Sequence, residues 1–202
     1  MTGDDHVTEH ARRRRQVALA GHAGDERSAR AGLGDGHPGT RATALGALAR
    51  ADALTDDDLR AGLADPDPAV RRRACELAAI HPGVELVDSL ADGDTTVVEA
   101  AAWALGEQGH DDDGTVAALS AIALHHKDPL CREAAVAALG AIGAEGGLAA
   151  ILVATEDKPA VRRRAVLALA PFEGPEVDAA LQRALVDRDW QVRQAAEDLL
   201  RE

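Results

Sequence analysis

One pattern returns six times along the chain, and it restricts the fold more than any other feature. Its clearest copy runs from Leu63 to Ala74 and centres on Arg71. The equivalent positions are Arg41, Arg71, Val98, Arg132, Arg162 and Arg193, with spacings of 30, 27, 34, 30 and 31 residues. A unit of this length cannot bury its apolar face alone, so the pattern predicts an array of stacked repeats.

When the six copies are aligned on this position, the residues just before it predict where helices begin. Three residues earlier stand Pro38, Pro68, Pro129 and Pro159 in four copies, and proline suits the first turn of a helix. One residue before that column stand Asp67, Asp94, Asp128 and Asp189, which can accept the free N–H groups of a helix start. An apolar stripe such as Val70, Ala74 and Ala78 follows.

A second, shorter helix precedes each of these helices. Thr55 and Asp58, for example, form the sequence signature of a capping box. Each unit therefore reads as helix, turn, helix. We predict an all-α fold, an α-solenoid of about six helix-turn-helix repeats with an N-terminal capping helix.

Several residues of the repeat resemble HEAT repeats, in particular the HEAT-like repeats of phycobilin lyases. The resemblance rests on Asp and Arg residues spaced six apart, and on the segments AAWALGEQG (101–109) and REAAVAALGAIG (132–143). The Asp and Arg pairs are Asp35/Arg41, Asp65/Arg71 and Asp187/Arg193, with Glu156/Arg162 as a variant. The resemblance covers residues 24–202 and implies a ladder of hydrogen bonds and ion pairs between successive repeats.

The ends of the chain set the expected domain boundaries. We expect residues 1–6 to be disordered and residues 7–202 to form a single HEAT-like repeat domain. The segment 7–20 resembles residues 162–169 and is expected to form the capping helix. No apolar run has the length of a signal or membrane segment. The excess of Ala, Arg and Gly is typical of a GC-rich genome, so we expect a monomeric cytoplasmic protein from a bacterium.

Charge and composition separate the candidate functions. The net charge of −13 repels phosphate backbones, and the aromatic residues that would stack on bases are only Phe172, Trp103 and Trp190. We therefore favour a scaffold that binds a protein or peptide over a nucleic-acid-binding protein related to the HEAT-like alkylpurine DNA glycosylases. A chromophore-lyase-like accessory protein is a further alternative.

Candidate catalytic and metal-binding groups have simpler structural explanations. In overall plan the array resembles deoxyhypusine hydroxylase, but the chain contains no His-Glu pair to supply that enzyme's iron ligands. His125 and His126 are adjacent and diverge on a helix, and the Asp run after His110 suits a helix start. Cys75 and Cys131 lie in apolar stretches and are expected to be buried and reduced. We predict no enzyme activity, catalytic residue, metal or cofactor.

Residues without a structural role in the repeat are the candidates for partner binding. They follow the repeated position on the second helices, where we expect a concave face: Arg72, Glu76, Glu99, Trp103, Glu133 and Arg163. Two alternatives stay open for them. The arginines of the runs at 71–73 and 162–164 either bind phosphate or pair with Glu76, Glu99 and Glu133. Trp103 is either an interface anchor or a packing residue. We expect Trp190 to pack.

The repeat predicts that two neighbouring arginines contribute differently to the free energy of unfolding. Arg71 occupies the repeated position and Arg72 does not, so Arg71→Ala should lower the free energy of unfolding by about 1–3 kcal/mol and Arg72→Ala by about 0.5 kcal/mol or less. Urea denaturation of both variants measures the difference. Equal midpoints would refute the structural role of the column.

Overall fold

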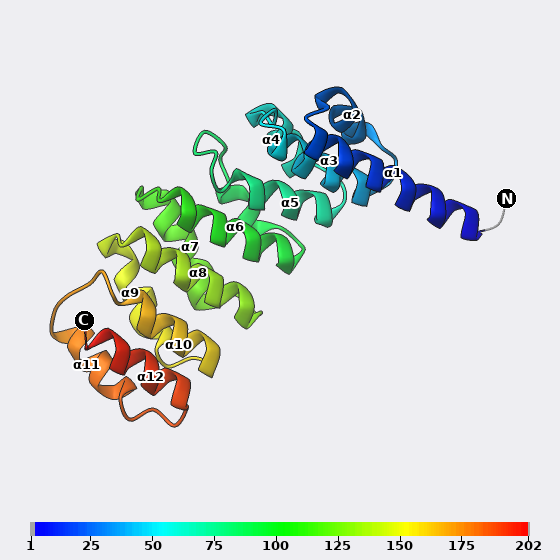
Figure 1. Cartoon of the computed structure of the whole chain (residues 1–202). Helices are drawn as coiled ribbons and strands as arrows, with labels where there is room; N and C mark the ends of the chain where they lie inside the picture. The colour runs from blue at the N-terminus through cyan, green and yellow to red at the C-terminus, as the bar shows by residue number, and fades with distance from the viewer. Residues whose placement is uncertain (1–2, 202) are drawn as a thin grey trace. The chain divides into compact units, whose positions relative to one another are not determined.

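A computed structural model describes residues 3–201, and the repeats are helix pairs, as the sequence predicts. Within this range there are twelve α-helices, three short 3₁₀-helices and no strand (Figure 1). The repeated Arg or Val position falls in the first turn of six of the α-helices, α3, α5, α6, α8, α10 and α12. The all-α, solenoid-type fold is confirmed.

Contacts divide the chain into two compact units, residues 1–85 and 86–202. The helices of the first unit are α1 (Gly3–Ala23), α2 (Glu26–Ala31), α3 (Pro38–Arg50), α4 (Asp56–Leu63) and α5 (Pro68–Ala78), with the 3₁₀-helix η1 (Gly32–Gly34). Helix α3 contacts both α1 and α5, so these three helices form one layer. Helices α2 and α4 cover it, α2 against α1 and α3 and α4 against α5 and α3.

The second unit repeats this arrangement over residues 86–202. Its elements are η2 (Val87–Ala91), α6 (Thr95–Gln108), α7 (Asp113–His125), α8 (Pro129–Ile142), η3 (Glu145–Gly147), α9 (Leu148–Ala154), α10 (Pro159–Ala168), α11 (Pro175–Ala184) and α12 (Trp190–Leu199). Helices α6, α8, α10 and α12 contact one another in this order. The other layer contains α7, α9 and α11, in contact in the same order.

The structure refines the expected boundaries in two places. Helix α1 begins at Gly3, inside the segment 1–6 that we expected to be disordered, while residues 1 and 2 lie outside the described residues. The third repeat has only the 3₁₀-helix η2 in place of a first helix. Its spacing is the shortest, and Pro82 and Gly83 interrupt the chain before it. That residues 7–202 act as a single domain stays a prediction.

The predicted helix starts are confirmed by their hydrogen bonds. The carboxylates of Asp67, Asp94, Asp128 and Asp189 each accept the backbone N–H two residues later, at 2.9–3.0 Å. Proline occupies the first turn at Pro38, Pro68, Pro129 and Pro159. Thr55 and Asp58 form the capping box of α4. The Asp run after His110 serves the same purpose, because Asp112 accepts the backbone N–H of Thr115.

Three arginines of the repeat, Arg41, Arg132 and Arg162, each contact an aspartate of the next repeat, as the resemblance implied. Arg41 donates from Nε and Nη2 to the Asp65 carboxylate, at 2.7 Å each, and from Nη1 to the Asp35 carbonyl within its own repeat. We call the contact to the carboxylate an inter-repeat Arg–Asp pair. Arg13 of α1 supplies an equivalent contact, 2.7 Å from Asp35, so the capping helix joins the array by the same chemistry.

The second unit contains two further inter-repeat Arg–Asp pairs. Arg132 binds Asp157 at 2.6 and 2.7 Å, and Arg162 binds Asp187 at 2.8 and 2.9 Å. Asp157 rather than Glu156 is therefore the partner in that repeat. Hydrogen bonds from Arg41, Arg132 and Arg162 hold the pKa values of their partners Asp65, Asp157 and Asp187 below the ordinary value.

The pair is absent between α6 and α8, and both of its partners are replaced. Val98 stands at the Arg position and is buried, while His126 stands at the Asp position. The His126 ring accepts the backbone N–H of Asp128 at 3.1 Å, as the Asp carboxylate does elsewhere. A buried charge without its partner lowers the stability of the fold. Because both the Arg and the Asp are replaced here, neither α6 nor α8 contains such an unpaired charge at these positions.

Close approach of helices within a layer depends on glycine facing alanine. A Cβ atom on Gly106 of α6 would lie 2.8 Å from Ala138 Cα of α8. One on Gly140 of α8 would lie 2.6 Å from both Ala168 Cα and Ala168 Cβ of α10. Such distances leave no room for a side chain, so α6, α8 and α10 pack nearly backbone to backbone.

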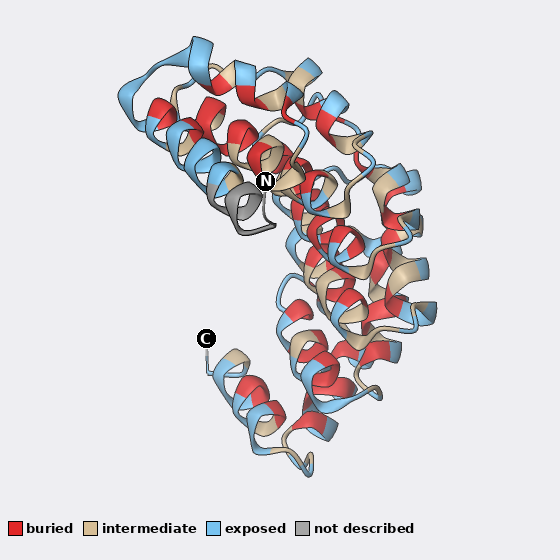
Figure 2. Cartoon of the chain, turned by 90° about the vertical axis from the view of Figure 1, so that its right-hand side faces the viewer, coloured by how far each residue is buried: buried red, intermediate tan, exposed pale blue. Residues whose placement is uncertain are grey.

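Small and branched aliphatic side chains fill the space between the layers. Figure 2 shows buried residues on the helix faces that meet one another and exposed residues on the outer faces. Cys75 and Cys131 are buried free thiols, as predicted. Burial raises the pKa of Cys131 to about 11, with a contribution from Asp128 and Glu99. None of the helices that the structure describes is both long and apolar enough to span a membrane.

The glycine contacts predict a sharp dependence on side-chain size. Gly140→Ala should lower the free energy of unfolding by about 1–3 kcal/mol because its methyl group overpacks against Ala168. Gly93→Ala is the matched control, since its Cβ would meet nothing within 4 Å. Urea midpoints compare the two variants. A Gly140→Ala protein as stable as the control would contradict the close packing of α8 and α10.

The lowered pKa values predict loss of stability in acid. An Asp with a lowered folded-state pKa contributes stability above its unfolded pKa of about 3.9, and this contribution disappears as pH falls through the folded value. The urea midpoint should therefore hold down to about pH 5 and drop below about pH 4. Asp187→Asn should be less stable at pH 7, by about 1–3 kcal/mol, and should lose less on acidification. An unchanged acid slope in this variant would argue against the pair.

Candidate partner-binding site

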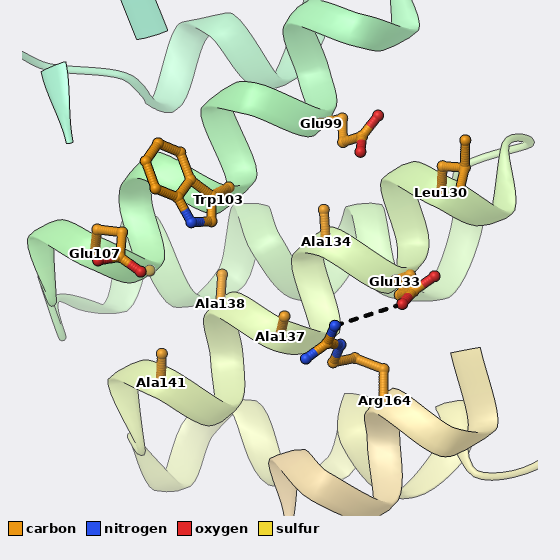
Figure 3. Close-up of a pocket in the computed structure, with 11 residues that line it drawn as sticks. Glu99, Trp103, Glu107, Leu130, Glu133, Ala134, Ala137, Ala138, Ala141 and Arg164 are labelled. Atoms are coloured by element: carbon orange, nitrogen blue, oxygen red, sulfur yellow. Dashed lines mark ion pairs between the residues drawn. The ribbon is translucent and has the colours of Figure 1, made fainter. Parts of the chain in front are cut away.

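An open cavity of about 680 Å³ lies between the second helices of two successive repeats, α6 and α8. Figure 3 shows Ala134, Ala137, Ala138 and Ala141 along α8 at its base, with charged and aromatic side chains around them. Gly106 of α6 also lines it. The cavity exists because small residues occupy α8 where it faces the bulky side chains of α6.

Helical spacing explains which α6 side chains reach the cavity. Glu99, Trp103 and Glu107 follow one another at intervals of four residues, so they lie along one face of the helix. Trp103 is 46% exposed, although a ring of this size is normally well buried. The equivalent residue of α8 is Ala137, which leaves the space beside the indole empty.

The charge of the cavity is predominantly negative. Glu133 of α8 forms an ion pair with Arg164 of α10, at 3.6 Å (Figure 3). Glu99 and Glu107 form no ion pair with any described residue. Three carboxylates against one guanidinium leave an excess of two negative charges beside the exposed indole.

The structure brings together three of the six residues that the sequence singled out. Glu99, Trp103 and Glu133 line this cavity, whereas Arg163 is exposed and does not. The neighbouring Arg164 takes the place expected for Arg163. Sequence reasoning also missed Glu107, although its spacing of eight residues from Glu99 placed it on the same helix face.

Arg72 and Glu76 lie in the first unit, on α5, and contact each other. Arg72 Nη1 is 3.2 Å from Glu76 Oε1, and Arg73 Nη1 is 2.9 Å from Glu76 Oε2. Arg72, Arg73 and Arg164 therefore form ion pairs with nearby glutamates, while phosphate binding by the arginine runs stays a prediction. Our expectation that Trp190 packs is wrong, because 64% of this residue is exposed at the start of α12.

Polar groups that could support metal chemistry are dispersed over the described part of the chain. No group of three or more His, Cys, Asp or Glu side chains is placed to hold a metal ion among those residues. His126 is engaged with the backbone of Asp128, and Asp112 caps α7.

Three solved structures with similar folds place the chain among helical repeat proteins. An engineered protein is 20% identical over 88% of this chain and 95% of its own, with a TM-score of 0.61. Human deoxyhypusine hydroxylase in complex with glycerol is 22% identical over 94% and 78%, with a TM-score of 0.50. A designed armadillo repeat protein in complex with the peptide (KR)4 is 18% identical over 98% and 93%, also with 0.50.

Comparisons by sequence identify the repeat itself. No relative was found among curated proteins. The model of the family described as HEAT repeats matches residues 83–157 and again residues 116–201. Together these matches span 83–201, more than half of the chain, and the protein therefore belongs to the HEAT-repeat family.

Proposed function

We propose that the protein is a non-enzymatic scaffold that binds a polypeptide partner, with the α6–α8 cavity receiving a cationic side chain of that partner. The observation that carries this proposal is the half-exposed Trp103 beside two carboxylates, Glu99 and Glu107, that form no ion pair. Exposed indole and unpaired acid together match the chemistry of lysine and arginine.

Each component of the cavity has a defined part in such binding. A lysine or arginine side chain can place its charge over the indole face, a contact that contributes about 0.5–2 kcal/mol. Glu99 and Glu107 can accept its hydrogen bonds, and charge-assisted bonds are the stronger kind. The alanine surface of α8 can cover the aliphatic part of the side chain, which removes apolar area from water.

A solved structure of similar fold also supports a peptide partner. The designed armadillo protein named above carries a basic peptide, (KR)4, and its fold is of the same stacked-repeat type. The acidic α6–α8 cavity has the charge that complements such a peptide. We expect the bound part of the partner to be an extended segment. Successive repeats line the cavity, so they would contact successive residues of that segment.

Nucleic acid is the competing partner, and the charge of this cavity disfavours it. Three carboxylates facing a phosphate backbone would repel it, and the chain carries a net charge of −13. The enzyme alternative lacks a counterpart of the His-Glu pairs expected of deoxyhypusine hydroxylase, since the sequence contains none.

Binding of the peptide (KR)4 tests the proposal. We expect calorimetry and quenching of tryptophan fluorescence to detect it at low ionic strength. The triple variant Glu99→Lys, Glu133→Lys, Trp103→Ala should bind at least about 100-fold more weakly, since it loses a cation–π contact and reverses two charges. Its helicity by circular dichroism should stay unchanged.

A matched control separates the cavity from general electrostatics. Glu145→Lys, Glu173→Lys, Trp190→Ala makes the same changes at exposed positions outside the cavity. It should retain binding within about three-fold, since only long-range charge changes. Equal losses in both variants, or tighter binding of duplex DNA than of peptide by the unaltered protein, would reject this assignment.

A further inference from the structure

A second open cavity, of about 350 Å³, lies within the first unit and has the opposite charge. Four arginines line it from three neighbouring helices, Arg14 from α1, Arg50 from α3, and Arg72 and Arg73 from α5. Helix α3 contacts both of its neighbours, so the three contributing helices form a continuous surface. It occupies the same place in its pair of repeats as the α6–α8 cavity, with Arg50 in the column of Glu107 and Arg72 in the column of Glu133, so the charge is reversed.

Carboxylates neutralise only part of this charge. Glu76 is the acidic partner of both Arg72 and Arg73. Arg14 and Arg50 form no ion pair with any described residue. The cavity therefore has four guanidinium groups and one paired carboxylate, although acidic residues outnumber basic ones in the whole chain by 35 to 22. Like charges gathered in this way repel one another unless an anion lies between them.

The base of the cavity is built to let the guanidinium groups approach the helix. A Cβ atom on Gly46 would lie 2.9 Å from Arg73 Nη2 and 3.6 Å from Arg50 Nη1. The missing side chain gives both groups room against the backbone of α3. Gly39, Ala42 and Ala69 continue this small-residue surface. Most other repeats carry a larger side chain in the column of Gly46, namely Glu76, Trp103, Leu167 and Asp198.

We propose that Arg14, Arg50, Arg72 and Arg73 form a binding site for a phosphomonoester dianion. Its two negative charges and three terminal oxygens match several guanidinium groups that approach from different helices. Arginine binds such oxygens through two parallel N–H donors, which fixes the geometry as well as the charge. Arg14 and Arg50 supply uncompensated charge, while Arg72 and Arg73 can turn donors from Glu76 toward the ligand.

Calorimetry with the full chain at pH 7.5 tests the site with three probes. These are inorganic phosphate, a phosphoserine peptide and the same peptide without phosphate. The phosphopeptide should bind at least about ten-fold more tightly than its unphosphorylated form, because the phosphoryl group provides charge-assisted hydrogen bonds. Inorganic phosphate of equal affinity would identify a free anion as the source, and weaker phosphate would identify a phosphorylated polypeptide.

Charge-matched variants make the test specific. Arg14→Gln, Arg50→Gln should weaken binding by at least about ten-fold, since both guanidinium groups contact the phosphoryl oxygens. Arg15→Gln, Arg27→Gln removes the same charge from exposed positions of the same unit and should change affinity by less than about three-fold. Thermal unfolding should be alike in both. The proposal is overturned if no probe binds, if both variants lose affinity equally, or if duplex DNA binds more tightly than the phosphopeptide.

Discussion

The contact on which each unit depends is the inter-repeat Arg–Asp pair. One guanidinium group donates to a backbone carbonyl of its own repeat and to the carboxylate of the next repeat. That carboxylate in turn accepts a backbone N–H of its own turn. Arg162 is an example, with bonds to the Asp157 carbonyl and the Asp187 carboxylate, which in turn accepts the N–H of Asp189. Helix start, turn and neighbouring repeat are thereby fixed by one side chain.

The candidate site lies where this contact is missing. Between α6 and α8 the positions of the pair are occupied by Val98 and His126, and the two helices are joined by apolar burial, by the approach of Gly106 to Ala138, and by a 3.3 Å bond from Cys131 Sγ to the Thr95 carbonyl. The same small side chains of α8 that permit this approach leave the cavity beside Trp103. Structure and candidate function therefore draw on one feature of composition, the high alanine content.

The sequence predicts structural features that recur in several repeats, but it does not predict those that occur in only one repeat. Helix starts and the Arg column could be predicted because six copies can be compared, and most copies form the same hydrogen bonds. Arg164 was missed in favour of Arg163 because adjacent residues of an Arg run differ only in helix phase. Trp190 was misjudged because its column holds proline or Thr95 in the other copies, and none of them shows where a large ring at that position would lie.

The direction of the Arg–Asp contact has a consequence for how such a chain can change its length in evolution. Each arginine contacts an aspartate about 25 residues further on, so a segment bounded by two equivalent arginines contains one complete set of partners. Excision of residues 132–161 would remove Arg132 together with Asp157 and would bring Arg162, with its partner Asp187, into the vacated position. Duplication of the same segment would add one pair. Recombination between repeats can therefore lengthen or shorten the gene without stranding a buried charge at the junction.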